Sequence, residues 1–165
     1  MNEIKFYDSL YEKLLFSTEN DFCIKDFYWI GEASIQEDKE LALKMCAQFL
    51  YKCFKCELLY FSMNLDIDSY INDENIEEFV RILSFENLEK IMCNYPLSDE
   101  IFTGNDFKLN NLESRIYYAD VYSTDLLNSI ANECELIAYV DNINMQDIRW
   151  IKFNKKINDS FNKIS

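Results

Sequence analysis

Two cysteines in this sequence have a spacing that is known from redox and metal sites. Cys53 and Cys56 form a Cys-x-x-Cys motif. Such a pair is redox active at the N-terminus of a helix, where the helix dipole lowers the pKa of a thiol. Here the motif falls near the C-terminal end of a predicted helix, where the dipole disfavours a thiolate. No second paired spacing for a zinc site comes from the other candidates Cys23, Cys93 and Cys134. The sequence therefore predicts cysteines that fill the core.

Carboxylates in the middle of the chain superficially match a calcium-binding loop. Within residues 66–77, acids occupy loop positions 1, 3 and 12. The sixth position of such a loop is glycine, because the chain turns sharply there, but this sequence has Ile71. We interpret the stretch as a polar turn that leads into a helix capped by Asp73. No metal and no cofactor is expected.

The lack of histidine removes the most common catalytic arrangements. The chain has no Ser-His-Asp unit, no Cys-His unit and no His-Glu-x-x-His zinc site. Its two glycines, Gly31 and Gly104, lie too far apart for a phosphate-binding loop. Carboxylate pairs remain, for example Asp120 with Asp125, but acids this common pair by chance. The sequence therefore favours a protein that is not an enzyme.

Charge dominates the composition of the 165-residue chain, which carries 30 acidic and 16 basic residues and a net charge of −14. Residues 63–111 alone contain eleven acids and three bases. Such a protein repels nucleic acid and anionic membranes and attracts basic surfaces. The first residues lack the basic start of a signal peptide, and charges interrupt every hydrophobic stretch. We expect a cytoplasmic protein with reduced cysteines.

The elements that must position these residues follow from hydrophobic periodicity. The spacing predicts a helix over 3–16 and a strand over 23–30 that ends at Gly31. A capping box at residues 34–37 predicts the start of a long helix, followed by a strand over 58–61. The face of that helix that we expect to be buried consists of Ala42, Cys46, Phe49, Leu50 and Cys53.

The second half of the chain alternates in the same way. We expect a helix after Asp73, a second helix from Ser84 that Pro96 ends, and a strand over 115–122. Thr124 is predicted to cap another helix. The remaining expected features are a polar loop over 98–111, strands over 135–140 and 148–153, and a polar, frayed tail from about residue 154.

These elements predict one domain over residues 1–165 of the α+β class. We expect a mixed or antiparallel sheet of about five short strands packed with about five helices. Helices and strands alternate without the regular glycine-marked units of a doubly wound sheet, and no Pro-, Gly- or Ser-rich linker divides the chain.

Tyrosines beside carboxylates are typical of protein-binding surfaces, because rigid amphipathic rings act as anchors. Acids steer a basic partner toward such a surface. The residues that we predict to bind a partner combine these two types: Asp66, Asp68, Tyr70, Asp73, Glu74, Glu77, Glu78, Tyr95, Asp99 and Glu100.

This profile resembles the immunity proteins of bacterial contact-dependent growth inhibition and related polymorphic toxin systems. The resemblance covers the whole chain in composition, and it is carried by the acidic run over residues 66–78 and the absence of histidine. It implies one-to-one binding of a cognate toxin with a basic surface, such as a nuclease domain, over or beside the active site of the toxin. It implies neither nucleic acid nor a membrane as a partner.

Two other functions remain open at the level of sequence. A phage-encoded inhibitor of a host defence nuclease, which mimics nucleic acid, would space its acids regularly along one face, whereas an immunity protein would present one compact patch. An enzyme that uses carboxylates alone would need a concave pocket with paired acids of perturbed pKa.

Overall fold

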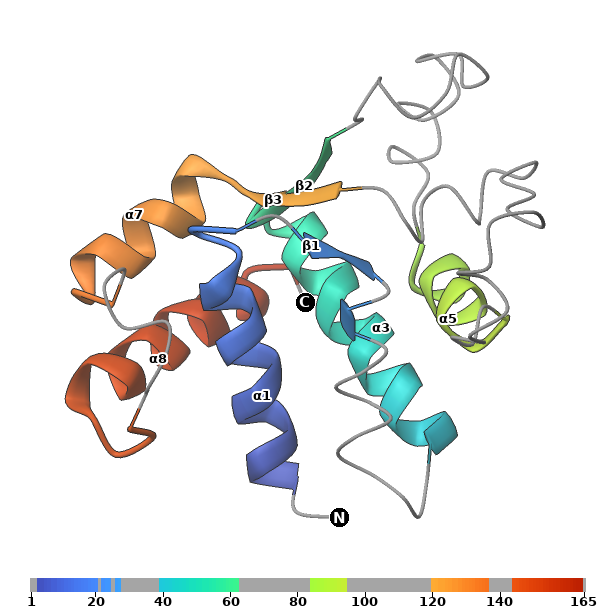
Figure 1. Ribbon diagram of the computed structural model, residues 1–165, viewed down its shortest axis with the longest axis horizontal. Helices are drawn as coiled ribbons and strands as arrows, with labels where there is room; N and C mark the ends of the chain where they lie inside the picture. Colours follow the sequence, from blue (N-terminus) through green and yellow to red (C-terminus); the bar gives the residue numbers. More distant parts are fainter. Residues whose placement is uncertain are drawn as a thin grey trace.

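The computed structural model describes residues 3–20, 22–24, 26–27, 39–62, 84–94, 120–136 and 144–164 (Figure 1). Within these ranges, helices and strands alternate along the chain, and the α+β class is confirmed. The elements are α1 (Glu3–Phe16), β1 (Phe22–Cys23), α3 (Lys39–Lys55), β2 (Leu59–Ser62), α5 (Phe85–Asn94), β3 (Asp120–Ser123), α7 (Asp125–Glu133) and α8 (Ile148–Asn162).

The three described strands form one antiparallel sheet in the order β1-β3-β2, so the third of them along the chain is central. Phe22 pairs with Val121 on one side, and Tyr60 pairs with Tyr122 on the other. The sheet was predicted to have about five strands; within the described ranges it has three.

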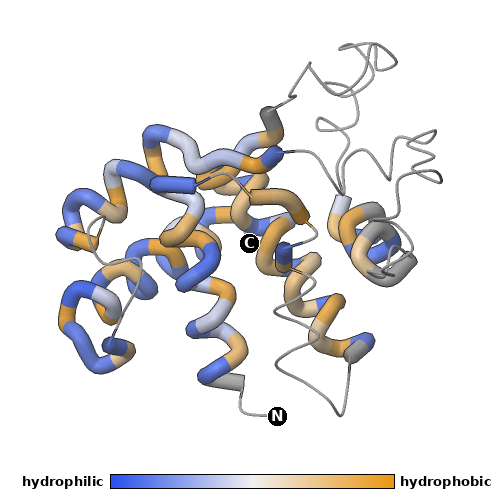
Figure 2. The backbone as a smooth tube through the Cα atoms, viewed as in Figure 1, coloured by the Kyte–Doolittle hydropathy of each residue, from blue (hydrophilic) through white to orange (hydrophobic). Residues whose placement is uncertain are grey.

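The core lies between the sheet and a group of helices formed by α1, α3 and α8. Figure 1 shows the sheet at one end of this group. Hydrophobic residues predominate along α3, whereas hydrophilic and hydrophobic residues alternate along α8 (Figure 2). The predicted buried face of α3 is confirmed, since Ala42, Cys46, Phe49, Leu50 and Cys53 are all buried.

Several predicted elements are confirmed closely. The helix over 3–16 matches α1, the strand over 58–61 matches β2 within one residue, and the helix after Ser84 matches α5. The Thr124 hydroxyl accepts a hydrogen bond from the Leu127 N–H and caps α7 as predicted. The predicted strand over 115–122 overlaps β3, whose described residues begin at Asp120.

The predicted strand over 23–30 is wrong after Cys23 as far as its residues are described; residues 25 and 28–30 lie outside the described part. β1 ends at Cys23, and Ile24, Asp26 and Phe27 are helical. The Asp26 carboxylate accepts the backbone N–H of Cys23 at 2.9 Å, which satisfies a donor that would otherwise extend the ladder. A side-chain acceptor three residues ahead therefore turns the chain out of the sheet.

The predicted strand over 148–153 and the frayed tail from 154 are also wrong, because both belong to α8. Asp147 caps this helix by accepting the Arg149 N–H at 2.9 Å. Its buried face consists of Trp150, Phe153, Ile157 and Phe161, at intervals of three and four residues. This helical stripe continues past residue 154, so burial holds the C-terminal turns in place.

Other expectations fall outside the described residues. They are the capping box at 34–37, the helix after Asp73, the loop over 98–111, Pro96 and most of the strand over 135–140. Of that last strand, Glu135 and Leu136 are described, and neither is in a strand: Glu135 lies in a turn after α7 with a left-handed φ of 59°, and Leu136 is buried.

Candidate functional site

The ten residues predicted to bind a partner all lie in the segments 63–83 and 95–119, outside the residues that the structure describes. They are Asp66, Asp68, Tyr70, Asp73, Glu74, Glu77, Glu78, Tyr95, Asp99 and Glu100. The described residues next to these segments, at the ends of β2 and β3, form the candidate surface. Both segments meet the sheet at one end, because Ser62, the last residue of β2, pairs with Asp120, the first residue of β3.

The two faces of the sheet differ, because successive strand residues point to opposite sides. Phe22, Leu59 and Val121 are buried against the helices, and Phe61 stacks on Phe54 of α3 with ring centroids 4.4 Å apart. The register places Tyr60, Tyr122 and Asp120 on the other face. We call this second face the tyrosine face.

Two stacked rings form the centre of the tyrosine face. Tyr60 and Tyr122 are direct cross-strand partners, and their ring centroids lie 5.8 Å apart with an interplanar angle of 28°. Tyr60 is 48% exposed, a large value for an aromatic residue in a strand. Stacking across the ladder fixes the rings before any partner arrives. Tyr60 therefore presents an amphipathic ring to solvent, and the half-buried Tyr122 ring supports it from the neighbouring strand.

Carboxylates lie at both ends of the tyrosine face. Asp120 is half-buried at the end where residues 63–83 and 95–119 join the sheet. At the other end, Glu57 and Asp125 are exposed, and the Thr124 hydroxyl, next to Asp125 in the chain, donates to the Glu57 backbone carbonyl at 2.6 Å. Glu57 has a left-handed φ of 58° in the turn before β2. The described surface thus combines two tyrosines with three acids.

The Cys-x-x-Cys motif does not form a reactive site. Cys53 is fully buried, and burial raises its pKa well above the ordinary value for a thiol. Cys56 lies just beyond α3 and donates through Sγ to the Ser160 carbonyl at 3.3 Å; burial raises its pKa too. The prediction of core cysteines is confirmed for Cys46, Cys53 and Cys134, whereas the side chain of Cys93 lies outside the described part.

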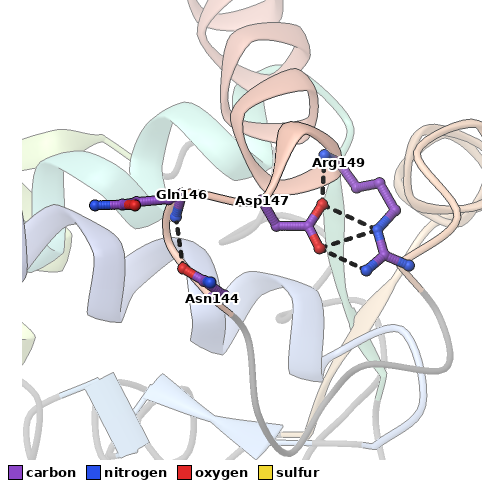
Figure 3. Close-up of polar contacts among 4 residues, drawn as sticks. All are labelled: Asn144, Gln146, Asp147 and Arg149. Carbon is purple, nitrogen blue, oxygen red and sulfur yellow. Dashed lines mark hydrogen bonds and ion pairs between the residues drawn. The ribbon is translucent and has the colours of Figure 1, made fainter.

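The start of α8 carries a half-buried carboxylate, Asp147, with a strongly lowered pKa. Figure 3 shows the Asp147 carboxylate facing the Arg149 guanidinium, with contacts of 3.0 and 3.1 Å to Nε. These side-chain hydrogen bonds, together with the Arg149 N–H, lower the pKa of Asp147 to about 2. In the same turn, the Gln146 N–H donates to Asn144 Oδ1. This cluster holds the helix start in place, and its groups satisfy one another.

The described residues form neither a metal site nor a membrane-spanning helix, and no relative of the chain was found. In the described ranges, no three His, Cys, Asp or Glu side chains gather as metal ligands, and no helix has the length and hydrophobicity to cross a bilayer. Comparisons with family models, curated proteins and solved structures gave no match to this chain.

Sequence reasoning missed Tyr60 and Tyr122, although it predicted the strands that carry them. Period-two alternation could have separated Tyr60 from Leu59 and Phe61, but all three residues are hydrophobic and the contrast is weak. The pairing of Tyr60 with Tyr122 joins residues 62 positions apart, and the sequence pattern does not specify it.

Proposed function

We propose that this protein is a non-enzymatic immunity protein that binds a cognate toxin, with a basic nuclease domain as the target, and covers its active or substrate-binding site. The observation that carries the proposal is the tyrosine face, in which the stacked pair Tyr60 and Tyr122 lies between carboxylates at both ends of the sheet.

Tyrosine pairs of this kind suit a tight interface. Hot spots are enriched in Tyr, which buries a large apolar area while its hydroxyl still finds a hydrogen-bond partner. Because Tyr60 and Tyr122 are already stacked, little conformational entropy is lost when a partner covers them. A partner with cationic side chains could in addition place one over a tyrosine ring.

The distribution of charge supports a basic partner. The described ranges contain fifteen acidic and twelve basic residues, so eleven of the fourteen net negative charges belong to the rest of the chain. Residues 63–83 follow β2 directly and residues 95–119 precede β3 directly. Residues 63–83 therefore begin beside the tyrosine face, and residues 95–119 end beside it. Complementary potentials of this kind raise association rates by about 10–1,000-fold.

The proposal is tested by co-expressing the protein in bacteria with the toxin domain encoded immediately upstream of its gene. The expected result is restored growth and a one-to-one complex that survives purification. If growth is not restored and no complex forms, the proposal is overturned. If the protein also inhibits unrelated nucleases with similar affinity, nucleic-acid mimicry takes its place.

A double variant tests the role of the tyrosine face separately. We expect Tyr60→Ala with Tyr122→Ala to weaken the complex at least 30-fold, since each hot-spot residue contributes about 2 kcal/mol or more. The matched control is Tyr7→Ala, which removes a tyrosine of similar exposure (41%) from α1. Equal weakening by the double variant and the control would show that the toxin binds elsewhere, while the immunity role would stand on growth rescue.

A further inference from the structure

Two buried polar side-chain atoms on α8 form no hydrogen bond within the described part of the chain. They are the indole Nε1 of Trp150 and the amide oxygen Oδ1 of Asn154. The whole Trp150 side chain is enclosed, with 1% of the residue exposed. The two atoms are complementary, because an indole N–H only donates and an amide oxygen only accepts. Buried polar groups are nearly always satisfied by protein or by ordered water, so this pair calls for a partner.

Both groups lie on the side of α8 that packs against α1. Trp150, Asn154 and Asn158 follow one another at intervals of four residues, so they form one stripe along the helix. Tyr11 of α1 contacts both ends of this stripe. Its ring packs edge-to-face on Trp150 with centroids 6.4 Å apart, and its hydroxyl donates to Asn158 Oδ1 at 2.6 Å. Asn154 stands between these two contacts and therefore faces the same helix as the indole.

The side chains around the stripe do not satisfy the two atoms themselves. Trp150 Nε1 and Asn154 Oδ1 are not bonded to each other. The Tyr11 hydroxyl gives its proton to Asn158, and burial raises the pKa of Tyr11, so this hydroxyl stays protonated and has no second proton for Asn154. Residues four apart on a helix have Cβ atoms about 5–6 Å apart. One water molecule bridges such a separation, since it can accept from the indole and donate to the amide oxygen.

We propose that the contact between α1 and α8 binds a single structural water, which accepts a hydrogen bond from Trp150 Nε1 and donates one to Asn154 Oδ1. The water completes the hydrogen bonding where the first described helix meets the last. This inference does not depend on toxin binding, because the stripe and the tyrosine face share no residue.

Nuclear magnetic resonance tests for the water directly in the full chain labelled with ¹⁵N-tryptophan. The sequence has two tryptophans, and the Trp150 indole signal is identified by its contact with the Tyr11 ring. We expect a rotating-frame Overhauser cross-peak between the Trp150 indole proton and water, opposite in sign to the diagonal. That sign marks dipolar contact with a bound water, whereas proton exchange gives the sign of the diagonal.

Tyr11→Phe is the control for this signal. It removes the one hydroxyl near the indole in the described ranges that could relay magnetisation from water by exchange. The cross-peak should persist in this variant, because the proposed water keeps both of its partners.

Two leucine variants give an independent test, since the expected sign differs between a bridged oxygen and an unpaired one. If the water is present, Asn154→Leu removes its acceptor, and the midpoint of urea denaturation should fall. If Asn154 Oδ1 has no partner, the same change removes an unpaired buried atom and the midpoint should rise. The matched control is Asn132→Leu, which makes the same change in helix propensity at an exposed position of α7.

Either measurement can overturn the site. The absence of the cross-peak, or its loss in Tyr11→Phe, rules out a bound water at the indole. A midpoint for Asn154→Leu equal to or above that of Asn132→Leu shows that the oxygen had no partner to lose. Circular dichroism verifies that each variant is folded.

Discussion

Cys53 is fully enclosed by the core, whereas Cys56 and Cys23 are half-buried. The same burial that makes Cys53 part of the core also raises its pKa, because a thiolate loses hydration there and the charge of Lys52 offsets only part of that loss. At the scale of single residues, environment rather than motif spacing therefore determines what the thiols can do.

We expect iodoacetamide to discriminate among these thiols in the folded protein. Cys23 and Cys56 should be alkylated at pH 8 while Cys46 and Cys53 stay unmodified, because reaction requires an accessible thiolate. Peptide mass spectrometry gives the rate at each site. In urea all sites should react at similar rates; alkylation of folded Cys53 as fast as Cys56 would contradict its enclosure.

The Asp147 carboxylate gives a prediction about pH. Its pKa is about 2 in the folded chain against an ordinary value of 3.8, so its contribution to stability is present above pH 4 and is lost as the pH falls toward 2. Asp147→Asn keeps a capping oxygen but loses the charge that faces Arg149. We expect this variant to be less stable than the wild type at pH 6 in urea denaturation.

The difference between wild type and Asp147→Asn should shrink as the pH falls from 4 to 2. Asp159→Asn serves as a control, since Asp159 is exposed on the same helix and shows no pairing with Arg149. A stability difference that does not change with pH would show that the ion pair contributes nothing.

At the scale of elements, the sequence predicts some local features correctly and mistakes others. The Thr124 cap and the stripe of α3 depend on neighbours within a few residues, and both were predicted. In α8 the first residues alone fit a strand, and Asn154, Lys155 and Lys156 suggest a polar tail. Trp150 and Ile157 belong to one buried stripe at helical spacing, and their burial in the core favours the helix over a strand.

The buried stripe of α8 makes its last turns structural. Ile157→Ala should lower the free energy of unfolding by about 2–5 kcal/mol, because Ile157 is fully buried and the substitution leaves a cavity. Lys155→Ala, on the exposed side of the same helix, should change it by about 0.5 kcal/mol or less. Urea denaturation measures both values, and similar small effects would mean that the end of the chain is frayed after all.

At the scale of the whole molecule, most of the net negative charge lies outside the described ranges, whereas the tyrosine face lies within them. The described ranges are nearly balanced in charge, while the acids predicted to bind a partner lie outside them. Composition gives the acidity of the chain, but the tyrosine face needs the pairing of β2 with β3, which depends on contacts distant in the sequence.

If the acidic stretch steers a toxin, Glu77→Lys with Glu78→Lys should slow association about tenfold or more, and added salt should slow association more than it speeds dissociation. Surface plasmon resonance against the toxin domain measures both rates. The matched control is Glu40→Lys with Glu86→Lys, which changes net charge equally at exposed sites on α3 and α5. Equal slowing by both pairs would mean that net charge alone matters.

The contact between the Tyr11 hydroxyl and Asn158 joins residues 147 positions apart. Phe161 likewise covers Phe49, and Trp150 packs edge-to-face against Tyr11. A ribosome must therefore finish translating α8 before the aromatic side of α1 and α3 can be covered. Until then the nascent chain exposes this hydrophobic surface, and the packing of α1 against α3 stays incomplete.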